Sequence, residues 1–297
     1  MTRFGCSHKG ARPVRLTRVP SVLVTGASRG IGRATALRLA SLGWEVFAGV
    51  RRPEDGEALV HESSGVSIAP LTLDVTEDAQ IAALDGLLPE RLDALVNNAG
   101  IVVPGPVEGL AIDELRRQFD VNVIGQVAVT QALLPRLRAA RGRIVFISSV
   151  SGRVSTPLMG AYSASKFALE GLADALRLEL RRWGIQVVLI EPGSIDTDLW
   201  RQAPEAARET EEALSSDVRT LYADHLTGIR KLIPRIQKQA ASTDAVTAAV
   251  ERALTSARPR ARYLVGNDAR GQVALTAALP TRASDAVLAR VTGTPSE

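Results

Sequence analysis

Short apolar runs and longer amphipathic stretches alternate along the chain from Ser21 onward. The runs are rich in β-branched residues and almost uniformly apolar, which is typical of strands covered on both faces in a parallel sheet. Seven such runs are candidate strands, at residues 21–25, 44–50, 66–75, 93–100, 143–149, 185–191 and 262–266. Helix-like segments lie between them, at about 30–42, 53–62, 77–88, 110–139 with an interruption, 160–183 and 243–256.

This alternation predicts a series of βαβ units, and right-handed crossovers wind such a series into a doubly wound α/β fold. We therefore expect a Rossmann fold, with a seven-stranded parallel sheet and helices on both faces. A chain of 297 residues has room for one large or two ordinary domains, but no linker or repeat divides the alternating part. We expect an N-terminal arm at 1–20, a single dinucleotide-binding catalytic domain at 21–280, and a C-terminal tail at 281–297.

The segment 199–240 departs from the alternation, because it is charged and has little β character. It is also longer than an ordinary connection between elements. We expect either a helical insertion or a mobile lid that covers a ligand, although plain structural decoration is an alternative.

The formal net charge of +4 would favour a nucleic acid or an anionic membrane as partner if the basic residues formed one patch. Residues 1–20, however, contain five basic residues and no acid, and the remainder is nearly balanced. The excess positive charge therefore belongs to the arm. We expect this arm to be disordered, and it is either a mis-set start of the chain or a weak tether to an anionic partner. Nucleic-acid binding rests on net charge alone, and we predict no nucleic-acid partner.

Cysteine and histidine usage limits the chemistry further. Cys6 is the only cysteine, so no intramolecular disulfide is available and a reducing cytoplasm suits the chain. No stretch approaches the ~18 apolar residues of a membrane span, and residues 1–20 lack the apolar core of a secretory signal. His8, His61 and His225 stand apart, without the spacing of metal ligands. We expect a cytoplasmic protein with no metal site and no integral membrane segment.

A glycine-rich loop follows the first predicted strand and opens a helix. Gly26 allows a sharp turn, Gly30 lets the backbone approach a pyrophosphate, and Gly32 lets the helix pack closely on the sheet. The spacing is not that of a P-loop, which needs Gly-Lys-Ser/Thr. The glycines could merely punctuate a turn, but the strand before them and the helix after them favour a phosphate site. We assign to this site Gly26, Ser28, Arg29, Gly30, Ile31 and Gly32.

The end of the second strand separates the two nicotinamide cofactors by charge. A carboxylate there would accept hydrogen bonds from a free adenosine ribose, whereas arginine can hold a 2′-phosphate through paired N–H donors. Arg51 occupies this position and no acid is present. Arg29 in the glycine loop could close on the same phosphate. The sequence therefore predicts that NADP(H) is preferred over NAD(H).

Two further strand ends are expected to reach the same ligand. Asp74 and Val75 close the third strand, where a carboxylate can accept a hydrogen bond from the adenine amino group. Asp74 could also cap the helix that follows, and both roles are compatible. Asn98, Ala99 and Gly100 close the fourth strand, where small residues admit the cofactor and amides hold neighbouring strand ends together.

Tyr162 and Lys166 lie four residues apart in a helical segment, hence on one face. A phenol with a pKa near 10 is a poor acid or base at neutral pH, and lowering the pKa by about three units takes roughly 4 kcal/mol. One ammonium at about 4 Å and an effective dielectric near 20 provides roughly that much. Only four lysines occur, so a lysine at 166 goes against the chain's own preference for arginine. We predict that Tyr162 is a general acid/base tuned by Lys166, although an exposed Tyr-Lys pair without function is the alternative.

Ser149 ends the fifth strand, where its hydroxyl could hydrogen-bond a substrate oxygen beside the phenol. Strand alternation turns its neighbour Ser148 to the opposite face. Asn122 lies in a helical stretch that should pass behind Lys166, where it either takes part in proton transfer or satisfies buried backbone.

At this point the chain resembles the classical short-chain dehydrogenase/reductase family. The likeness rests on several motifs in the family's order and spacing: Thr25-Gly26-x-x-x-Gly30-Ile31-Gly32, Asn97-Asn98-Ala99-Gly100, Asn122, Ser149, Tyr162-Ser163-Ala164-Ser165-Lys166 and Pro192-Gly193. A weaker likeness to the 17β-hydroxysteroid and retinol dehydrogenase branch rests on the arginine after the second strand and on residues 262–266.

The resemblance implies further roles. Lys166 would also bond the nicotinamide ribose hydroxyls, and Asn122 would hold a water that links Lys166 to solvent. The segment that begins at Pro192 and Gly193 would orient the nicotinamide carboxamide, which the family assigns to the backbone of Ile195 and the hydroxyl of Thr197. The helices at about 110–139 and 160–183 would form a homodimer or homotetramer.

The sequence thus predicts hydride transfer between NADP(H) and a carbonyl or alcohol substrate, with Asn122, Ser149, Tyr162 and Lys166 as the catalytic set. The substrate pocket would lie at 199–240 and 150–161. Apolar side chains there suit a steroid-, retinoid- or lipid-like carbonyl, yet they could equally pack the insertion onto the core: Leu199, Trp200, Leu214, Leu221, Tyr222 and Leu226. The alternative is a non-catalytic NADP(H)-binding regulatory protein of the same fold, which would not need a proton-transfer pair.

Overall fold

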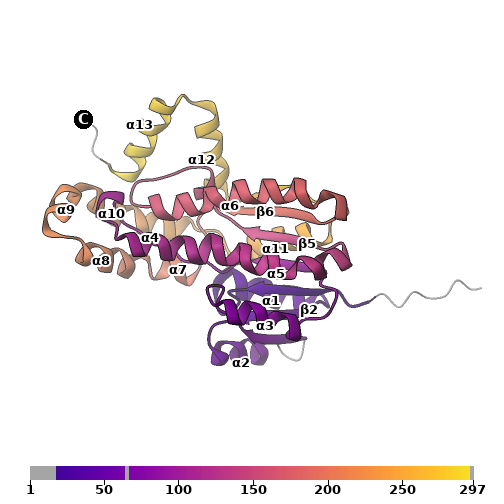
Figure 1. The fold of residues 1–297 in the computed structure, drawn as a ribbon. Coiled ribbons are helices and arrows are strands. Elements are labelled where there is room, and N and C mark those ends of the chain that lie inside the picture. Colours follow the sequence, from indigo (N-terminus) through magenta and orange to yellow (C-terminus); the bar gives the residue numbers. More distant parts are fainter. Residues whose placement is uncertain (1–17, 64–66, 295–297) are drawn as a thin grey trace, which may run out of the picture.

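A single parallel sheet forms the centre of the protein, whose computed structural model describes residues 18–63 and 67–294 (Figure 1). Its strand order is β3-β2-β1-β4-β5-β6-β7, so the order reverses between β1 and β4. The seven strands are β1 (Ser21–Thr25), β2 (Glu45–Val50), β3 (Ile68–Thr72), β4 (Ala94–Asn97), β5 (Arg143–Ile147), β6 (Gln186–Pro192) and β7 (Arg262–Val265). Each strand predicted from an apolar run is confirmed, with several ends shorter by a few residues, and the predicted Rossmann-like doubly wound fold is confirmed with them.

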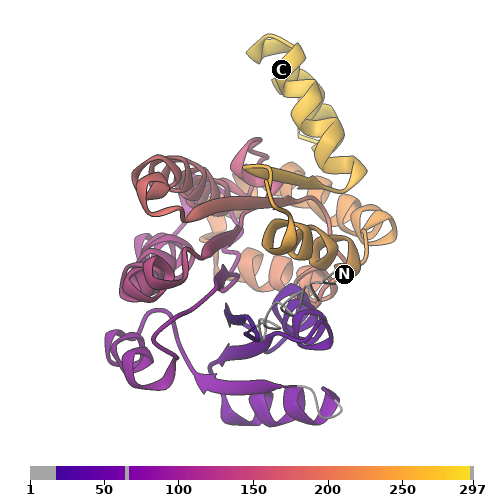
Figure 2. The ribbon, with the colours of Figure 1, turned by 90° about the vertical axis from the view of Figure 1, so that its right-hand side faces the viewer.

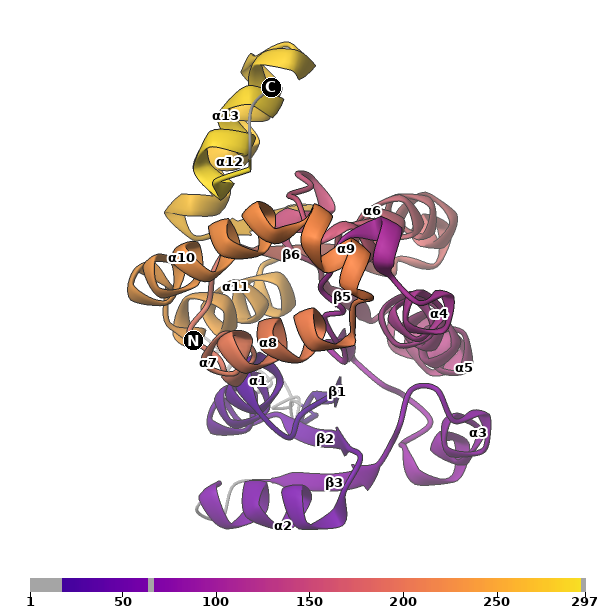
Figure 3. The same cartoon turned by 90° about the vertical axis from the view of Figure 1, so that its left-hand side faces the viewer.

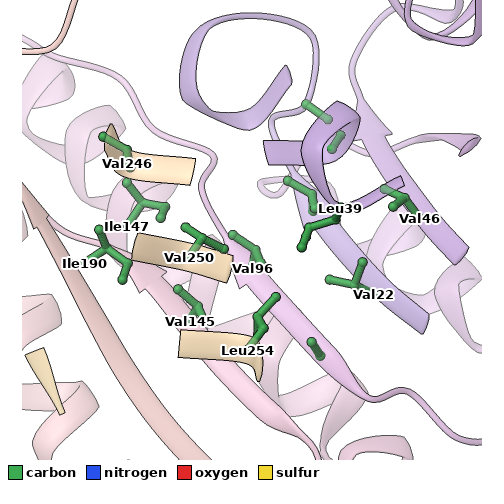
Figure 4. Packing of buried hydrophobic residues seen from close by; sticks show 14 of the residues in the cluster. Val22, Leu39, Val46, Val96, Val145, Ile147, Ile190, Val246, Val250 and Leu254 are labelled. Atoms are coloured by element: carbon green, nitrogen blue, oxygen red, sulfur yellow. The ribbon is translucent and has the colours of Figure 1, made fainter. Parts of the chain in front are cut away.

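Helices cover both faces of this sheet because successive strand residues alternate between them. Val22 and Val24 of β1 join a core beneath α1 and α11, whereas Leu23 joins the core beneath α5 and α6. Figure 4 shows the first of these cores, in which strand valines and isoleucines meet Leu39 and Val250 from the two helices. The covering helices are α1 (Gly30–Ser41), α2 (Pro53–Glu62), α3 (Asp78–Leu87), α4 (Ile112–Phe119), α5 (Gly125–Ala140), α6 (Gly160–Glu179) and α11 (Thr243–Thr255).

The interruption predicted within 110–139 is a π-helical turn, η2 (Asp120–Ile124), between α4 and α5. Such turns leave backbone groups free of the regular helical pattern and are frequent at functional sites.

The segment between β6 and α11 is helical, and it faces the viewer in Figure 3. Its two ends are hydrogen-bonded together, from the Asp196 N–H to the Ala241 carbonyl at 2.8 Å and from the Ala241 N–H to the Ser194 carbonyl at 2.9 Å. The insertion therefore leaves and rejoins the body at one point. It comprises α7 (Asp198–Arg201), α8 (Ala203–Ala213), α9 (Ser216–Leu221) and α10 (Ala223–Gln239).

Two helices follow β7, α12 (Asn267–Ala278) and α13 (Thr281–Thr292), and they project from the body in Figure 2 and Figure 3. Gly228 of α10 lies against the end of α13, where a Cβ atom would come within 2.5 Å of the Thr292 carbonyl oxygen. Residues 281–292, expected as part of a tail, thus form a helix that contacts the insertion. The basic arm lies outside the described residues up to residue 17, and so does Cys6. Within the described ranges, no helix combines the length and the apolar character that crossing a membrane requires.

Candidate active site

The carboxyl ends of the central strands open onto a cleft of about 610 Å³. It lies beside the reversal of strand order between β1 and β4, where open α/β sheets generally bind ligands. Two of the predicted site residues, Gly32 and Asn122, do not line it. All the others do: Gly26, Ser28, Arg29, Gly30, Ile31, Arg51, Asp74, Val75, Asn98, Ala99, Gly100, Ser149, Tyr162, Lys166, Pro192, Gly193, Ile195 and Thr197.

The glycine loop needs its glycines for reasons visible in the backbone. Gly26 and Gly30 have φ values of 64° and 54°, in the left-handed region that side chains disfavour. At Gly32, a Cβ atom would lie 2.2 Å from the Gly26 carbonyl oxygen and 2.4 Å from Asn98 Nδ2. The loop therefore packs too closely for any larger residue at position 32, and α1 begins with its free N–H groups facing the cleft.

The ends of β1 and β4 are tied together beneath this loop. Asn98 Nδ2 donates to the carbonyl oxygens of Thr25 and Gly26, each at 3.0 Å. The Thr25 hydroxyl in turn accepts the backbone N–H groups of Asn98 and Ala99 at 3.0 Å. An amide at this strand end thus fixes the neighbouring strand end, as expected from its position.

Two arginines present unpaired charge to the cleft. Neither the Arg29 guanidinium nor the Arg51 guanidinium forms a hydrogen bond or ion pair within the described part of the chain, and both residues line the cavity. Their neighbour Arg52, by contrast, forms a bidentate pair with Asp55 on the surface. A pair of free guanidinium groups beside the second strand suits a phosphate ester.

Asp74 lines the cleft but is already engaged in a turn. Its Oδ1 accepts hydrogen bonds from the Thr76 N–H at 3.0 Å and from the Thr76 hydroxyl at 2.7 Å. Helix α3 begins only at Asp78, with Glu77 before it. The expectation that Asp74 caps this helix is therefore wrong, because its carboxylate closes the preceding turn instead.

Tyr162, Lys166 and Ser149 converge at the other end of the cleft. Lys166 lies one turn beyond Tyr162 on α6 and is 4% exposed. Its Nζ donates to the Ile147 carbonyl at 2.8 Å and lies 5.8 Å from the centre of the phenol ring. Ser149 bonds Tyr162, accepts the Ser151 N–H at 3.1 Å and reaches the Pro192 carbonyl at 3.5 Å. This arrangement places a phenol, a hydroxyl and an ammonium around one space.

In the protein alone, burial shifts the pKa values of both Tyr162 and Lys166. It raises the pKa of Tyr162, against the opposing effect of the hydrogen bond to Ser149. It also lowers the pKa of Lys166 to about 8, against the attraction of Glu170. In the protein alone, the expected lowering of the Tyr162 pKa by Lys166 does not occur, and this pKa is raised instead. Lys166 Nζ bonds the Ile147 carbonyl instead, and the loss of solvent around the phenol outweighs the effect of Ser149.

Asn122 lies behind the cleft in the π-helical turn η2 and is fully buried. Its Oδ1 accepts the Ile101 N–H at 2.8 Å, and its Nδ2 donates to the Ile101 carbonyl at 3.0 Å and to the Ser165 hydroxyl at 3.2 Å. The side chain therefore satisfies the backbone that follows β4, which is the alternative weighed from the sequence.

The insertion contributes α7 to the cleft. Asp198 and Trp200 line it, and the side chain of Leu199 lies outside the description. The remaining candidates pack or point elsewhere: Leu214 and Leu226 form a cluster with Leu158, Tyr222 donates to Glu108, and Leu221 is 68% exposed.

Asp268 of α12 was missed by sequence reasoning. Its carboxylate accepts the Ser194 N–H at 2.7 Å, and a Cβ on Gly193 would lie 2.3 Å from it. It thus holds the segment 192–197 that lines the cleft. A glycine in an otherwise polar loop was the one available signal, because the partner lies far along the chain.

Comparisons with known proteins identify the family. The family model described as short chain dehydrogenase matches residues 20–208. The chain is 35% identical to "NADPH-dependent 3-dehydrocapnine reductase" of Ornithobacterium rhinotracheale, over 82% of this chain and 87% of that protein. It is 33% identical to "Retinol dehydrogenase 5" of Mus musculus, over 93% and 90%.

Solved structures give the same result. A short-chain dehydrogenase from Burkholderia cenocepacia, solved in complex with NADP, superposes with a TM-score of 0.70 at 25% identity and covers 92% of this chain and 97% of its own. Sequence motifs, strand order, cleft and relatives therefore lead to one conclusion: this chain belongs to the short-chain dehydrogenase/reductase family of oxidoreductases.

Proposed function

We propose that this protein transfers a hydride between NADP(H) and a carbonyl or alcohol substrate of apolar character, with Tyr162 as general acid/base. The observation that carries the proposal is the cleft itself. One part of it holds the unpaired Arg29 and Arg51, and another holds Tyr162, Ser149 and Lys166. A relative named as an NADPH-dependent reductase and a neighbour solved with NADP support the choice of cofactor.

The cleft residues fit such a dinucleotide. Arg29 and Arg51 would hold the 2′-phosphate, and the N–H groups at the start of α1 near Gly30 would hold the pyrophosphate. Lys166 would bond the ribose, while Ile195 and Thr197 would orient the carboxamide. When bound, the nicotinamide supplies or accepts the hydride.

The protein's own groups provide the proton. The Tyr162 phenol carries its proton near neutral pH and can donate it to a substrate oxygen during reduction, although burial raises its pKa in the protein alone and so makes it a weaker acid. The Ser149 hydroxyl bonds the same oxygen and holds it beside the phenol. Lys166, with a pKa of about 8, is mostly charged at pH 7 and favours the phenolate left after the proton has gone.

The apolar substrate class rests on apolar residues that line the cleft. Ile101, Val102 and Trp200 are three of them, and the retinol dehydrogenase relative has a name consistent with such a substrate. These side chains would contact the carbon skeleton, leaving the oxygen to Tyr162 and Ser149.

A panel of aldehydes and ketones tests this function, with NADPH consumption followed by absorbance. We expect turnover on apolar members of the panel, and Tyr162→Phe to lower kcat by at least ~10³-fold because no proton donor replaces the phenol. Activity within tenfold of the parent in Tyr162→Phe would refute the role of Tyr162. Tight NADPH binding without turnover across the panel would favour the regulatory alternative.

We further propose a homodimer or homotetramer that uses α6. Phe167 and Leu178 on this helix are 45% and 65% exposed, and large exposed apolar side chains on one element are typical of interfaces. Light scattering tests the assembly, and a monomeric mass would contradict it.

A further inference from the structure

A partly buried cluster of charged side chains lies next to Lys166 and the turn that carries Ser149. Glu170 of α6 and Glu191 of β6 have side chains only 8% and 0% exposed, and Arg262 of β7 lies between them. The attraction within a buried ion pair is largely offset by the free energy lost on removing its charges from water. Stability alone therefore does not account for this cluster.

Arg262 connects three carboxylates that come from two elements. Its Nε donates to Glu170 Oε2 at 2.9 Å and lies 3.1 Å from Glu191 Oε1. Its Nη2 donates to Asp174 Oδ2 at 2.8 Å. The guanidinium thus fixes the carboxylate of Glu170 and joins α6 to the end of β6, immediately before Pro192.

The second oxygen of Glu170 holds the serine segment. The Ser148 hydroxyl donates to Glu170 Oε1 at 2.6 Å, and Ser148 is the residue before Ser149. Gly152 closes the turn so tightly that a Cβ atom there would lie 3.0 Å from both Glu170 Cγ and the Ser148 hydroxyl. Both ends of the turn 148–152 are therefore packed on Glu170.

Glu170 also acts on Lys166, which precedes it by one helical turn on α6. Its negative charge favours the ammonium form of Lys166, which burial disfavours. The same carboxylate therefore has a mechanical contact with the serine segment and an electrostatic effect on the lysine.

We propose that Glu170 is a positioning residue, which holds the turn carrying Ser149 against α6 and supports the charge of Lys166. Arg262 keeps its carboxylate in place. The consequence for catalysis rests on the function proposed above. The effect on Lys166 does not, because it is a property of the protein alone.

The charged groups that face Glu170 come from every element packed around it. Lys166 and Asp174 lie on α6, Glu191 on β6 and Arg262 on β7, and Arg153 after β5 reaches Glu191 at 3.3 Å. Removal of Asp174 deprives Arg262 of a partner without touching Ser148. Asp174→Ala is therefore the matched control for Glu170→Ala.

The first measurement needs no substrate. Trace acetic anhydride, applied over a series of pH values, reports the protonation of each lysine when peptides are quantified by mass spectrometry, with the exposed Lys231 and Lys238 as internal references. The reagent reaches Lys166 through the cleft. We expect the labelling midpoint of Lys166 to fall by about half to one pH unit in Glu170→Ala and by clearly less in Asp174→Ala.

The second measurement uses the reaction. Glu170→Ala should lower kcat by about tenfold, since Ser149 loses its support, with the affinity for NADPH kept within about twofold. Asp174→Ala should keep kcat within about twofold. Ser148→Ala leaves the ion pairs intact, so it folds even if Glu170→Ala does not. It should lower kcat about three- to tenfold. Combining it with Glu170→Ala should lower kcat little further.

Equal labelling midpoints in Glu170→Ala and Asp174→Ala would overturn the proposal, as would full kcat in Ser148→Ala. If the parent protein reduces no carbonyl compound, the proposed function fails instead. The labelling midpoints then decide the role of Glu170 by themselves.

Discussion

Asp268 closes over Gly193: its carboxylate accepts the neighbouring Ser194 N–H at 2.7 Å, in space that a Cβ on Gly193 would enter at 2.3 Å. Gly193→Ala should therefore push this carboxylate away and shift the segment 192–197. We expect the dissociation constant for NADPH to rise by about tenfold, because one wall of the cleft moves. Fluorescence titration with NADPH measures it.

Gly271→Ala is the matched control for this change. Gly271 lies in the same helix as Asp268, and a Cβ atom there meets nothing within 4 Å. NADPH affinity should be unchanged in this variant. Equal affinity in Gly193→Ala and the parent protein would show that Asp268 does not hold the segment.

Arg29 and Arg51 should determine the choice between the two nicotinamide cofactors. Each change to alanine removes donors from the 2′-phosphate, so we expect kcat/KM with NADPH to fall by about tenfold per arginine, with little change for NADH. Arg52→Ala, which removes a surface pair with Asp55, should alter neither value. An unaltered preference for NADPH in the double variant would contradict this assignment.

Glu191 should make the stability of the protein depend on pH. Burial, together with the nearby Glu170, raises the pKa of Glu191 from its ordinary value of 4.5 to about 7. Between these values the folded protein binds more protons than the unfolded chain, so the free energy of unfolding falls as the pH rises. Glutamine cannot ionise, and Glu191→Gln removes this loss.

The effect is read as the difference in Tm between Glu191→Gln and the parent protein. From pH 5 to pH 8, the Tm of Glu191→Gln should rise by about 2–4 °C relative to that of the parent protein. This is the shift expected for a change of roughly 1 kcal/mol in the free energy of unfolding of a protein of this size. The same difference at both pH values would mean that Glu191 is not protonated in the folded protein near neutral pH.

Two glycine-to-alanine changes should have opposite effects on stability. At Gly32 a Cβ atom would overlap the backbone oxygen of Gly26 at 2.2 Å, so we expect a loss of about 1–3 kcal/mol. Gly171 of α6 has open space around it, and alanine there should add about 0.5–1 kcal/mol through better helix propensity. Thermal unfolding of both variants tests the pair, and a similar Tm for the two would refute the steric argument.

Features of the fold and the site that depend on neighbouring residues in the chain could be predicted from the sequence. Apolar runs predicted each strand, because a buried parallel strand needs apolar residues on both faces. The glycine loop and the Tyr162–Lys166 spacing placed both ends of the cleft for the same reason. Period-two alternation was expected to turn Ser148 away from Ser149, but both serines lie beyond the end of β5 and both line the cleft, and Ser148 bonds Glu170 on α6.

Contacts between residues that are distant in the chain could not be predicted from the sequence. Arg262 lies 92 residues beyond Glu170, and nothing in the local pattern of either residue indicates their contact. The direction of the Tyr162 pKa shift was also beyond reach, since the loss of solvent around the phenol depends on how closely all neighbours pack. Glu191, an acid at the end of an apolar strand, was the clearest available sign of a buried partner.

The hydrogen bonds that join Ser194 and Asp196 to Ala241 at the base of the insertion have a consequence for evolution and design. Because the body itself brings these two ends together, the entropy needed to close the loop depends only weakly on what lies between them. Helices α7 to α10 can therefore be exchanged as one unit while the strands and α6 keep their geometry, provided that the replacement keeps the contacts with Glu108, Leu158 and the end of α13. Swapping residues 198–239 between relatives therefore tests the expectation that this insertion carries the substrate preference.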